Sequence, residues 1–531
     1  MKTKSKIIGI ISLIVAAGIY YYIALPAINI HSVDVWYFIL FLVAAAGVIY
    51  AVKNKIGKNE IRESKVLKII ISLFIILLAI YAIGTILSSP IVNAKKYQSL
   101  LTVEEGEFTK DIEELSFDQI PILDKDSAII LGERKMGSMS DMVSQFEVDN
   151  IYSQINYQDK PVRVSPVRYA NIVKWFTNRS EGLPAYIMID MATQTTTLVK
   201  LDEGMKYSTS EHFGRNIYRH LRFEYPTYIF DDICFEIDED GVPYWIAPVV
   251  KYNIGLFGGR TVGRVVLCNA ITGETTDYAI EDVPEWIDHA YSANLLIELY
   301  DYYGSLKHGF INSVLSQKDC LVTTNGYNYL AIDDDVWVYT GVTSVNSDQS
   351  NVGFVLMNQR TMETKYYNVE GAIEDSAMDS AEGQVQHLGY EATFPLLLNI
   401  SGEPTYFIAL KDDAGLVKKY AMVNVQKYQL VAIGDTVSQC EEEYNNLLFS
   451  SGIKEVAQDT REVLEITGTI TKIAQGVVDG NSHYFIMVEG SEDIFDVSVV
   501  DYIDIIRYEI GDEVTMEYKA GEKTNTVLSV K

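Results

Sequence analysis

Residues 241–280 read GVPYWIAPVVKYNIGLFGGRTVGRVVLCNAITGETTDYAI and contain three apolar runs separated by two turns. Runs rich in Val, Ile, Tyr and Trp that are bounded by glycine are typical of strands, so this stretch predicts an antiparallel meander. Its glycine-rich segment GLFGG, residues 255–259, lies between two runs and does not precede a helix. The segment therefore predicts the tip of a hairpin and not a phosphate-binding loop.

A similar pattern returns at residues 402–434, which read GEPTYFIALKDDAGLVKKYAMVNVQKYQLVAIG. Upstream of the two stretches, residues 186–210 align with residues 354–378 without a gap, and a helix-like segment follows in each place. Self-similarity on this scale predicts two α+β repeats and not a solenoid of short units. Each repeat is expected to contain two strands, a helix and a meander of three or four strands.

These patterns predict an α+β protein with a C-terminal β-barrel. The expected parts are a transmembrane domain (1–90), a stalk and membrane-proximal cap (91–175), the first repeat (176–281), a helical connector (282–335), the second repeat (336–440), a helical linker (441–463) and the barrel (464–531). The barrel region has five strand-like runs with a short helix between the third and the fourth, which resembles an OB-fold. Its acids outnumber its bases, which disfavours the nucleic acid that many OB-folds bind.

Three apolar runs without Asp, Glu, Lys, Arg or His lie at residues 7–25, 35–52 and 69–87. At ~1.5 Å per residue each can cross a hydrocarbon core of about 30 Å, so three transmembrane helices are expected. The N-terminal MKTKSK and residues 53–68 are rich in Lys and Arg, whereas residues 26–34 have neither. The positive-inside rule then predicts a multi-pass plasma-membrane protein with a cytoplasmic N-terminus and an extracytoplasmic chain after residue 88. Spans without charged residues favour an anchor over a transport path.

The acidic side chains are concentrated outside the membrane block. The chain has a formal net charge of −29, although residues 1–88 contain nine Lys or Arg and three acids. A surface this acidic repels phosphate backbones, so nucleic acid is not an expected partner. The expected partners are the lipid bilayer and an envelope protein or cell-wall component, and the oligomeric state is left open.

Candidate ligand residues do not form a recognisable set, so no catalytic, cofactor-binding or metal-binding residue is assigned and no cofactor is expected. Cys234, Cys268, Cys320 and Cys440 are far apart and form no CxxC, which leaves their pairing open. His212 and His220 lie eight residues apart, but no acid or cysteine completes a metal site with them, and the other histidines are dispersed (His31, His289, His308, His387, His483).

Two acidic segments, Asp238-Glu239-Asp240-Gly241 and Asp333-Asp334-Asp335, could supply oxygen ligands to calcium. Neither is followed by the bidentate acid of a twelve-residue calcium loop, so solvated turns are the favoured interpretation. Asn178 and Asn399 fit the glycosylation pattern, which matters only in a host that glycosylates.

The turn Asn269-Ala-Ile-Thr-Gly-Glu274 within VLCNAITGET resembles the turn of PepSY-type modules, in which a helix precedes three antiparallel strands. The second copy lacks the Thr and the Gly-Glu at residues 424–428. Over its full length, including LRFEYPTYIFDD at residues 221–232, the chain resembles a family of uncharacterised Gram-positive three-helix membrane proteins, some of which carry a colicin V production-like label. The resemblance implies a location in the cell envelope and no particular reaction.

The expected function is that of a non-enzymatic, membrane-anchored envelope protein whose acidic ectodomain binds a protein or cell-wall partner. Two alternatives stay open. One is an envelope hydrolase that acts on peptidoglycan or peptides with carboxylates or histidines that converge only in three dimensions. The other is a subunit of a transport or secretion assembly.

Overall fold

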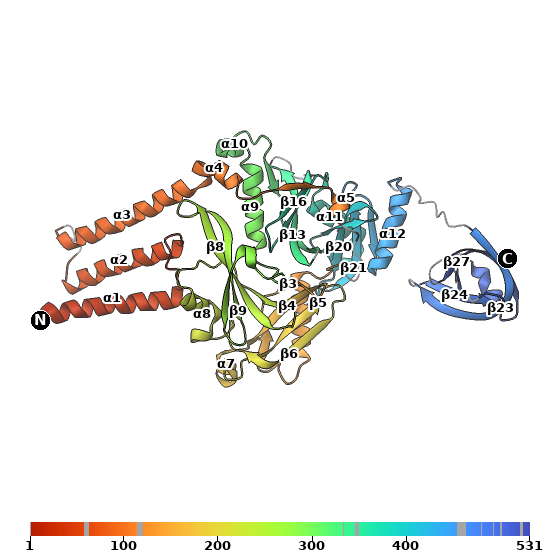
Figure 1. Cartoon of the computed structure of the whole chain (residues 1–531), viewed down its shortest axis with the longest axis horizontal. Helices are drawn as coiled ribbons and strands as arrows, with labels where there is room; N and C mark the ends of the chain where they lie inside the picture. The colour runs from red at the N-terminus through yellow and green to blue at the C-terminus, as the bar shows by residue number, and fades with distance from the viewer. Residues whose placement is uncertain are drawn as a thin grey trace. The chain divides into compact units, whose positions relative to one another are not determined.

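The structure, a computed structural model, describes residues 2–57, 63–112, 114, 120–332, 334–345, 350–453, 463–478, 481–491, 493–499, 502–520 and 524–531. The chain divides into two compact units, Met1–Val431 and Ala432–Lys531, and Figure 1 shows its helices and strands. Part of the predicted basic loop (Lys58, Glu60, Arg62) and Asp333 of the acidic run lie outside the described residues.

The first unit begins with the helices α1 (Lys2–Ala24), α2 (Val33–Lys53) and α3 (Lys65–Ser88). By length and composition, α2 and α3 could each cross a membrane, whereas α1 contributes a shorter apolar stretch, Ile8–Ala24. Two candidate spans are therefore present in the described residues, and the third remains a prediction. Contacts join α1 to α2 and α2 to α3.

A five-stranded sheet follows α4 (Pro90–Gln98), α5 (Phe108–Asp111) and α6 (Lys125–Gly137). Its order is β2-β4-β5-β6, and β3 pairs with β4. The strands are β2 (Phe146–Val148), β3 (Ser153–Tyr157), β4 (Lys160–Tyr169), β5 (Leu183–Asp190) and β6 (Thr196–Met205), with α7 (Ile172–Asn178) between β4 and β5. The sheet thus continues across the boundary that the sequence suggested at residue 175. The sequence does not predict β4 as one long strand, because it contains Pro161 and Pro166 and proline normally argues against a strand inside a sheet.

Residues 241–280 form the meander of a four-stranded sheet with the order β10-β9-β8-β7. Its strands are β7 (Cys234–Ile237), β8 (Pro243–Ile254), β9 (Gly258–Asn269) and β10 (Thr275–Ala279). The short helices η2 (Phe213–Arg215) and α8 (Ile217–Glu224) precede it, and η3 (Ile280–Asp282) and α9 (Ala293–Ser305) follow it.

The second set of sheets begins earlier than the sequence suggested. After α10 (Phe310–Val314), the strands β11 (Leu321–Thr323) and β12 (Asn328–Ile332) lie within the expected helical connector and pair with β13 (Asp335–Ser344). The sheet order is β1-β16-β15-β13-β11, with β1 (Glu104–Gly106), β15 (Gly353–Asn358) and β16 (Thr364–Tyr367). Propensity alone misses β11 and β12, because both are short and only partly buried.

A further meander follows a small two-stranded pair, β14 (Ser350–Asn351) with β17 (Gly371–Ala372), and α11 (Glu374–Gln384) and η4 (Gln386–Leu388). It has the order β18-β20-β21-β22, and β19 pairs with β20. The strands are β18 (Glu391–Ala392), β19 (Leu396–Ile400), β20 (Glu403–Lys411), β21 (Val417–Asn424) and β22 (Val431–Gly434).

One turn conformation recurs in both sets of sheets, directly after Asp190, Asn269 and Asn358. In each case the side-chain oxygen accepts hydrogen bonds of 2.7–3.0 Å from the backbone N–H groups two and three residues further on. The residue four positions on has a positive φ (Gln194 59°, Gly273 79°, Met362 65°). The Thr-Gly-Glu turn is thus one instance of an Asx turn that closes three strand pairs. The other two turns have Gln194 and Met362 at this position, whereas a Cβ atom on Gly273 would clash with the Tyr207 ring.

An apolar core joins the two sets of sheets within the first unit. Ile246 and Val265 of the first meander share this core with α9 and with Val338, Val355 and Met357 of β13 and β15. A separate core fills the space between the two sheets of the first set. The segment expected to be a connector therefore supplies a packed helix between the sets.

The second unit contains α12 (Val437–Ser450) and a closed five-stranded barrel, with the order β23-β24-β25-β27-β26. Its strands are β23 (Val463–Val478), β24 (Asn481–Val488), β25 (Phe495–Ser498), β26 (Glu513–Lys519) and β27 (Asn525–Val530), with η5 (Ile503–Arg507) between the third and the fourth. This confirms a closed barrel of five strands. Buried Ile470, Ile486, Phe495 and Met516 belong to its core.

Candidate functional site

The hairpin tip of residues 255–259 contacts the end of α3. Ser88, the last residue of α3, is 2% exposed. Its Oγ atom accepts hydrogen bonds from the backbone N–H groups of Leu256 (2.8 Å) and Phe257 (3.1 Å), and it donates one to the carbonyl oxygen of Gly84 (2.7 Å). One buried hydroxyl therefore joins the hairpin tip to the end of the apolar helix α3.

The glycines of the tip allow this close approach. A Cβ atom on Gly258 would clash with the carbonyl oxygen of Ser88, and one on Gly255 would clash with the Ser88 hydroxyl. Gly84 on α3 is matched to the tip in the same way, because a Cβ there would lie 2.8 Å from Cδ1 of Leu256. The glycine-rich segment is therefore the tip of a hairpin, as the sequence indicated, and its composition serves packing against α3.

Aromatic side chains complete this junction. The Phe257 ring lies 5.3 Å from Tyr81 of α3 and 6.2 Å from Trp36 of α2. His31, between α1 and α2, has its Nδ1 atom 2.8 Å from the carbonyl oxygen of Leu256, to which it donates a hydrogen bond. The hydroxyl of Tyr97 on α4 donates to the Ser88 carbonyl oxygen at 2.6 Å. The tip thus contacts or bonds to residues near all three helices.

A second junction connects the end of α1 to the segment LRFEYPTY, residues 221–228. The Nε atom of Arg222 donates to the carbonyl oxygen of Leu25 (2.9 Å), and Nη1 donates to those of Tyr225 and Tyr228. The backbone N–H of Ile28 donates a hydrogen bond to the carbonyl oxygen of Pro226 (2.7 Å). These bonds give a structural role to the sequence that carried the family resemblance.

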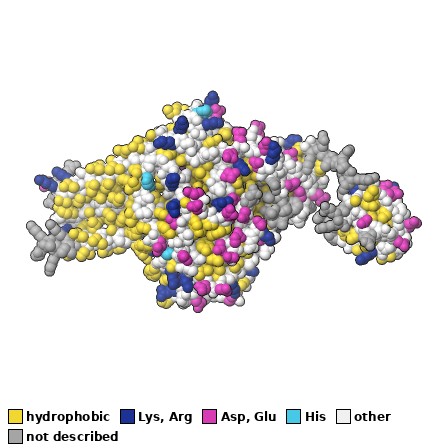
Figure 2. All heavy atoms as spheres, in the orientation of Figure 1, with side chains coloured by type: hydrophobic (Ala, Val, Ile, Leu, Met, Phe, Trp, Pro, Cys, Tyr) yellow, Lys and Arg dark blue, Asp and Glu magenta, His cyan; other side chains and the backbone are white. Residues whose placement is uncertain are grey.

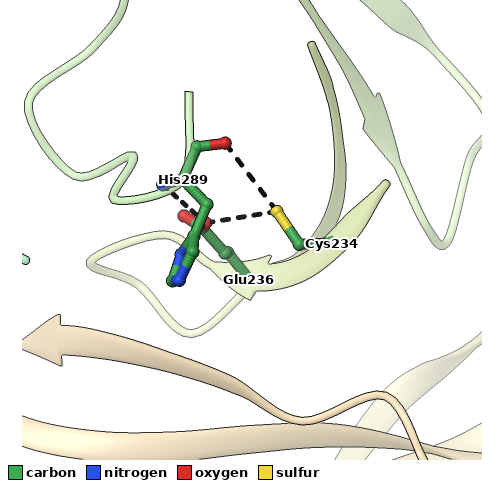
Figure 3. A group of neighbouring side chains, drawn as sticks. All are labelled: Cys234, Glu236 and His289. Carbon is green, nitrogen blue, oxygen red and sulfur yellow. Dashed lines mark hydrogen bonds and ion pairs between the residues drawn. The ribbon is translucent and has the colours of Figure 1, made fainter. Parts of the chain in front are cut away.

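A polar cluster is formed by Cys234, Glu236 and His289, whose side chains point toward one another (Figure 3), and Glu236 at its centre is fully buried. Cys234 and Glu236 are two residues apart on β7 and so lie on the same face of the strand. Oε1 of Glu236 accepts hydrogen bonds from Nδ1 of His289 (2.8 Å), from its backbone N–H (3.0 Å) and from the Cys234 thiol (3.5 Å). Oε2 accepts one from the backbone N–H of Asp288 (3.1 Å).

These residues fit a hydrogen-bond hub better than a metal centre. A carboxylate offers about four lone-pair sites, and protein donors fill that number at Glu236. The 2.8 Å separation of His289 Nδ1 and Glu236 Oε1 is that of a hydrogen bond, whereas two such donors on one tetrahedral zinc would lie roughly 3.3 Å apart. The cluster therefore fixes the segment before α9 to β7. Sequence reasoning missed it, because residues 236 and 289 are brought together only by tertiary folding.

Burial dominates the electrostatics of this hub. Burial raises the pKa of Asp288 well above its ordinary value, and the neighbouring charge of Glu236 raises it further. The Asp288 Oδ2 atom accepts a hydrogen bond from the backbone N–H of Asn156 (2.8 Å), while Oδ1 has no partner in the described part of the chain. Burial also raises the pKa of the Cys234 thiol well above its ordinary value, so that the thiol stays protonated and donates to Glu236.

The structure separates the other residues that the sequence singled out. Cys234, Cys268, Cys320 and Cys440 are thiols and are not joined in disulfides. His212 packs edge-on against Trp175 at 4.6 Å, whereas the Nε2 atom of His220 lies 2.8 Å from the carbonyl oxygen of Gly273, so the two do not share a ligand site.

The acidic runs form turns and ion pairs. Asp238 Oδ1 accepts from the backbone N–H groups of Asp240 and Val242, which makes a turn. Asp335 binds Arg360 through two hydrogen bonds of 2.6 and 2.8 Å, so its oxygens are already engaged. The segment at Asp238 is a turn, as expected, whereas Asp335 is buried at the start of β13 and does not fit the interpretation of a solvated turn.

An open hollow of about 590 Å³ lies between β6 and the turn after β9. Tyr186 borders it and donates a hydrogen bond to the carbonyl oxygen of Gly241 (3.0 Å), and burial raises the pKa of that tyrosine to about 12. The lining combines aromatic, apolar and acidic side chains, among them Tyr157, Met188, Val199, Asp202, Glu203 and Asp240.

No protein-family model matches the chain, and no curated protein is significantly similar to it.

Proposed function

We propose that the protein is a membrane-anchored scaffold of the cell envelope. Helices α1–α3 would anchor it, and the acidic region after residue 88 would lie outside the cell and bind a protein or cell-wall partner. The observation that carries this proposal is the pair of hydrogen bonds between Ser88 and the hairpin tip, because they would hold the ectodomain in one position on the anchor. A fixed position is what a scaffold needs to present a binding face.

We further propose that the ectodomain is a duplicated PepSY-like fold followed by an OB-like barrel. The recurrence of one Asx turn after Asp190, Asn269 and Asn358 supports the duplication. Five strands with a short helix between the third and the fourth support the OB-like assignment. Both modules are common in proteins that bind partners rather than transform them.

The hollow beside β6 is the proposed binding face. Strand β6 stands at the end of its sheet order, so one edge has no strand partner among the described residues. An extended peptide can add to such an edge through main-chain hydrogen bonds. Asp202, Glu203 and Asp240 make the hollow acidic against a single Lys200, which favours a partner segment that carries Lys or Arg.

The hydrolase alternative predicts a deep cleft lined by carboxylates between the two sets of sheets. Described residues there form an apolar core instead, with α9 packed between β9 and β13. The closely spaced carboxylates of Glu236 and Asp288 are buried and face protein donors. These observations favour the scaffold over the hydrolase as the function to test first.

The test is crosslinking and recovery of the tagged full-length chain from its native membrane. We expect one partner with an exposed basic segment to be recovered with the wild-type chain and with Asp413→Lys, which reverses an exposed charge outside the hollow. Glu203→Lys, which reverses an exposed charge inside the hollow, should lose that partner. Equal recovery with both variants would reject the hollow as the binding face. Recovery of membrane subunits alone would favour the transport or secretion assembly.

A further inference from the structure

Large apolar side chains are exposed at two places on the ectodomain part of the first unit. Most of those between residues 89 and 431 that are exposed by more than a third lie on α7 with η2 and α8, or on α4 with α10. These are Ile91, Val92, Ile172, Val173, Phe176, Phe213, Tyr218, Phe223, Ile311, Val314 and Leu315. Exposed apolar groups gathered in this way mark an interaction surface.

The first place, the α7–α8 patch, comprises Ile172, Val173, Phe176, Phe213, Tyr218 and Phe223 together with Lys174, Arg179, Arg215 and Arg219. It is continuous, because Trp175 of α7 lies 6.0 Å from Phe213, and Arg215 donates a hydrogen bond to the carbonyl oxygen of Arg179 (2.6 Å). It also touches the end of α1. The Arg219 guanidinium lies 4.5 Å from the Tyr22 ring, and Phe223 lies 6.0 Å from Tyr21.

The second place, the α4–α10 patch, comprises Ile91, Val92, Ile311, Val314 and Leu315 together with Lys95, Lys96, Lys307 and Lys318. Only Ser89 separates α4 from α3, so this patch begins where the third apolar helix ends. Helix α10 contacts α4. Each patch therefore adjoins the end of an apolar helix, one at α1 and the other at α3.

The charge of both patches differs from that of the surrounding ectodomain. Residues 90–98 contain two lysines and no acid, whereas the chain as a whole has a net charge of −29. Figure 2 shows Lys and Arg side chains gathered over the regions of α7 and α10. Aromatic and aliphatic side chains mixed with Lys and Arg are typical of segments that lie at a membrane interface.

We infer that the α7–α8 and α4–α10 patches lie in the headgroup layer of the bilayer that α1–α3 cross and bind anionic phospholipid headgroups. The inference rests on the membrane anchoring proposed above. The apolar side chains enter the boundary of the acyl chains, and the basic side chains pair with lipid phosphates. The two patches act as supports on opposite sides of the helices and offset the repulsion between the acidic ectodomain and an anionic surface.

The test uses the full chain in vesicles that contain phosphatidylcholine and phosphatidylglycerol, with one of the two lipids tagged. Phe176 or Ile311, which are 63% and 74% exposed, is replaced by the photocrosslinking residue p-benzoylphenylalanine. We expect irradiation to attach lipid at both positions. The matched control is Tyr428, which is 42% exposed and should stay unlabelled. It follows β21, a strand that Figure 1 shows on the side of the first unit away from α1–α3.

Charge is tested with Lys174→Gln and Arg179→Gln in the Phe176 crosslinking variant. Each should lower the preference for phosphatidylglycerol over phosphatidylcholine about fivefold, because one basic residue near an anionic surface contributes about that factor. Lys427→Gln, an exposed lysine after β21, should leave the preference unchanged.

Alkaline carbonate extraction of the same vesicles separates the two hypotheses. If the chain resists extraction but positions 176 and 311 take no lipid, the inference is wrong and the anchoring stands. If the chain is extracted, the anchoring is wrong, and the labels still report whether the patches bind lipid. Equal labelling from the two lipids would reject the anionic headgroup as the ligand.

Discussion

The hydroxyl oxygen of Ser88 lies 2.8 Å from the backbone nitrogen of Leu256 and accepts its hydrogen bond, although the two residues are 168 positions apart in the chain. The same oxygen accepts from Phe257, so a single side chain satisfies two backbone donors at the turn of a hairpin. Buried donors that lose their acceptor are costly. This makes Ser88 the most direct place at which to test the contact between the hairpin tip and α3.

Replacing Ser88 by alanine should loosen the hairpin tip. The variant removes the acceptor of two partly buried N–H groups, at about 1–3 kcal/mol for a donor left unsatisfied. Amide hydrogen exchange of the full chain should become faster at residues 254–258 and stay unchanged in the barrel. Ser89→Ala is the matched control, because the Ser89 hydroxyl bonds only to Ile86 within its own helix turn among the bonds described. Unchanged exchange in Ser88→Ala would contradict the role given to this hydroxyl.

Gly258→Ala should destabilise the same junction through packing. The added Cβ atom meets the backbone oxygens of Ser88 and Ile254, which cannot move away as a flexible side chain could. Overpacking of this kind typically costs about 1–3 kcal/mol, so the thermal midpoint of the first unit should fall. In Gly137→Ala, no atom lies within 4 Å of the new Cβ, so this control should unfold like the wild type. A thermal midpoint equal to that of the wild type would show that the hairpin tip accommodates a Cβ atom at position 258, which would contradict the close packing against Ser88.

The residues of this junction also show what a sequence can and cannot predict. The meander of residues 241–280 and the five-stranded barrel follow from local patterns of apolar residues and turns. Pro161 and Pro166 argue against a strand at β4, and β11 and β12 are too short and too little buried to give a clear strand pattern. The pairs Ser88–Leu256 and Glu236–His289 depend on long-range packing, which no local pattern encodes.

The buried carboxyl of Asp288 should make stability depend on pH. Its pKa is raised in the folded protein by burial and by Glu236, Asp335 and Asp334, whereas an unfolded Asp titrates near pH ~3.9. The folded state therefore binds more protons between these two pKa values, and stability falls as the pH rises above about 4. Asp288→Asn keeps an acceptor for Asn156 but cannot ionise.

The thermal midpoint of the full chain, measured from about pH 4 upward, should decline less in Asp288→Asn than in the wild type. Asp202→Asn, at an exposed position, should decline in parallel with the wild type. Parallel curves for Asp288→Asn and the wild type would mean that this carboxyl is not buried in the way described.

The Cys234–Glu236–His289 hub should not require a metal. Because protein donors occupy the lone pairs of Glu236, we expect neither a chelator nor added zinc to shift the thermal midpoint. The purified chain should contain no zinc in stoichiometric amount by elemental analysis. Cys234 should react slowly with iodoacetamide in the folded chain, because its buried thiol has a raised pKa, and rapidly after unfolding. Stoichiometric zinc that is lost in His289→Ala would overturn the hub interpretation.

The proposed orientation of the proposed membrane anchor can be tested with trypsin on intact protoplasts. If the region after residue 88 is extracytoplasmic, trypsin should reach exposed sites such as Lys427 without lysis of the cells. The loop between α2 and α3 should behave in the opposite way, since exposed Lys53 and Lys55 would face the cytoplasm and be cut only after lysis. A tag at the C-terminus and mass spectrometry of the fragments identify which sites were cut. Protection of Lys427 together with cleavage at Lys53 in intact protoplasts would reverse the orientation. The α7–α8 and α4–α10 patches would then face the anionic cytoplasmic leaflet, where their basic residues would bind lipid phosphates at least as well.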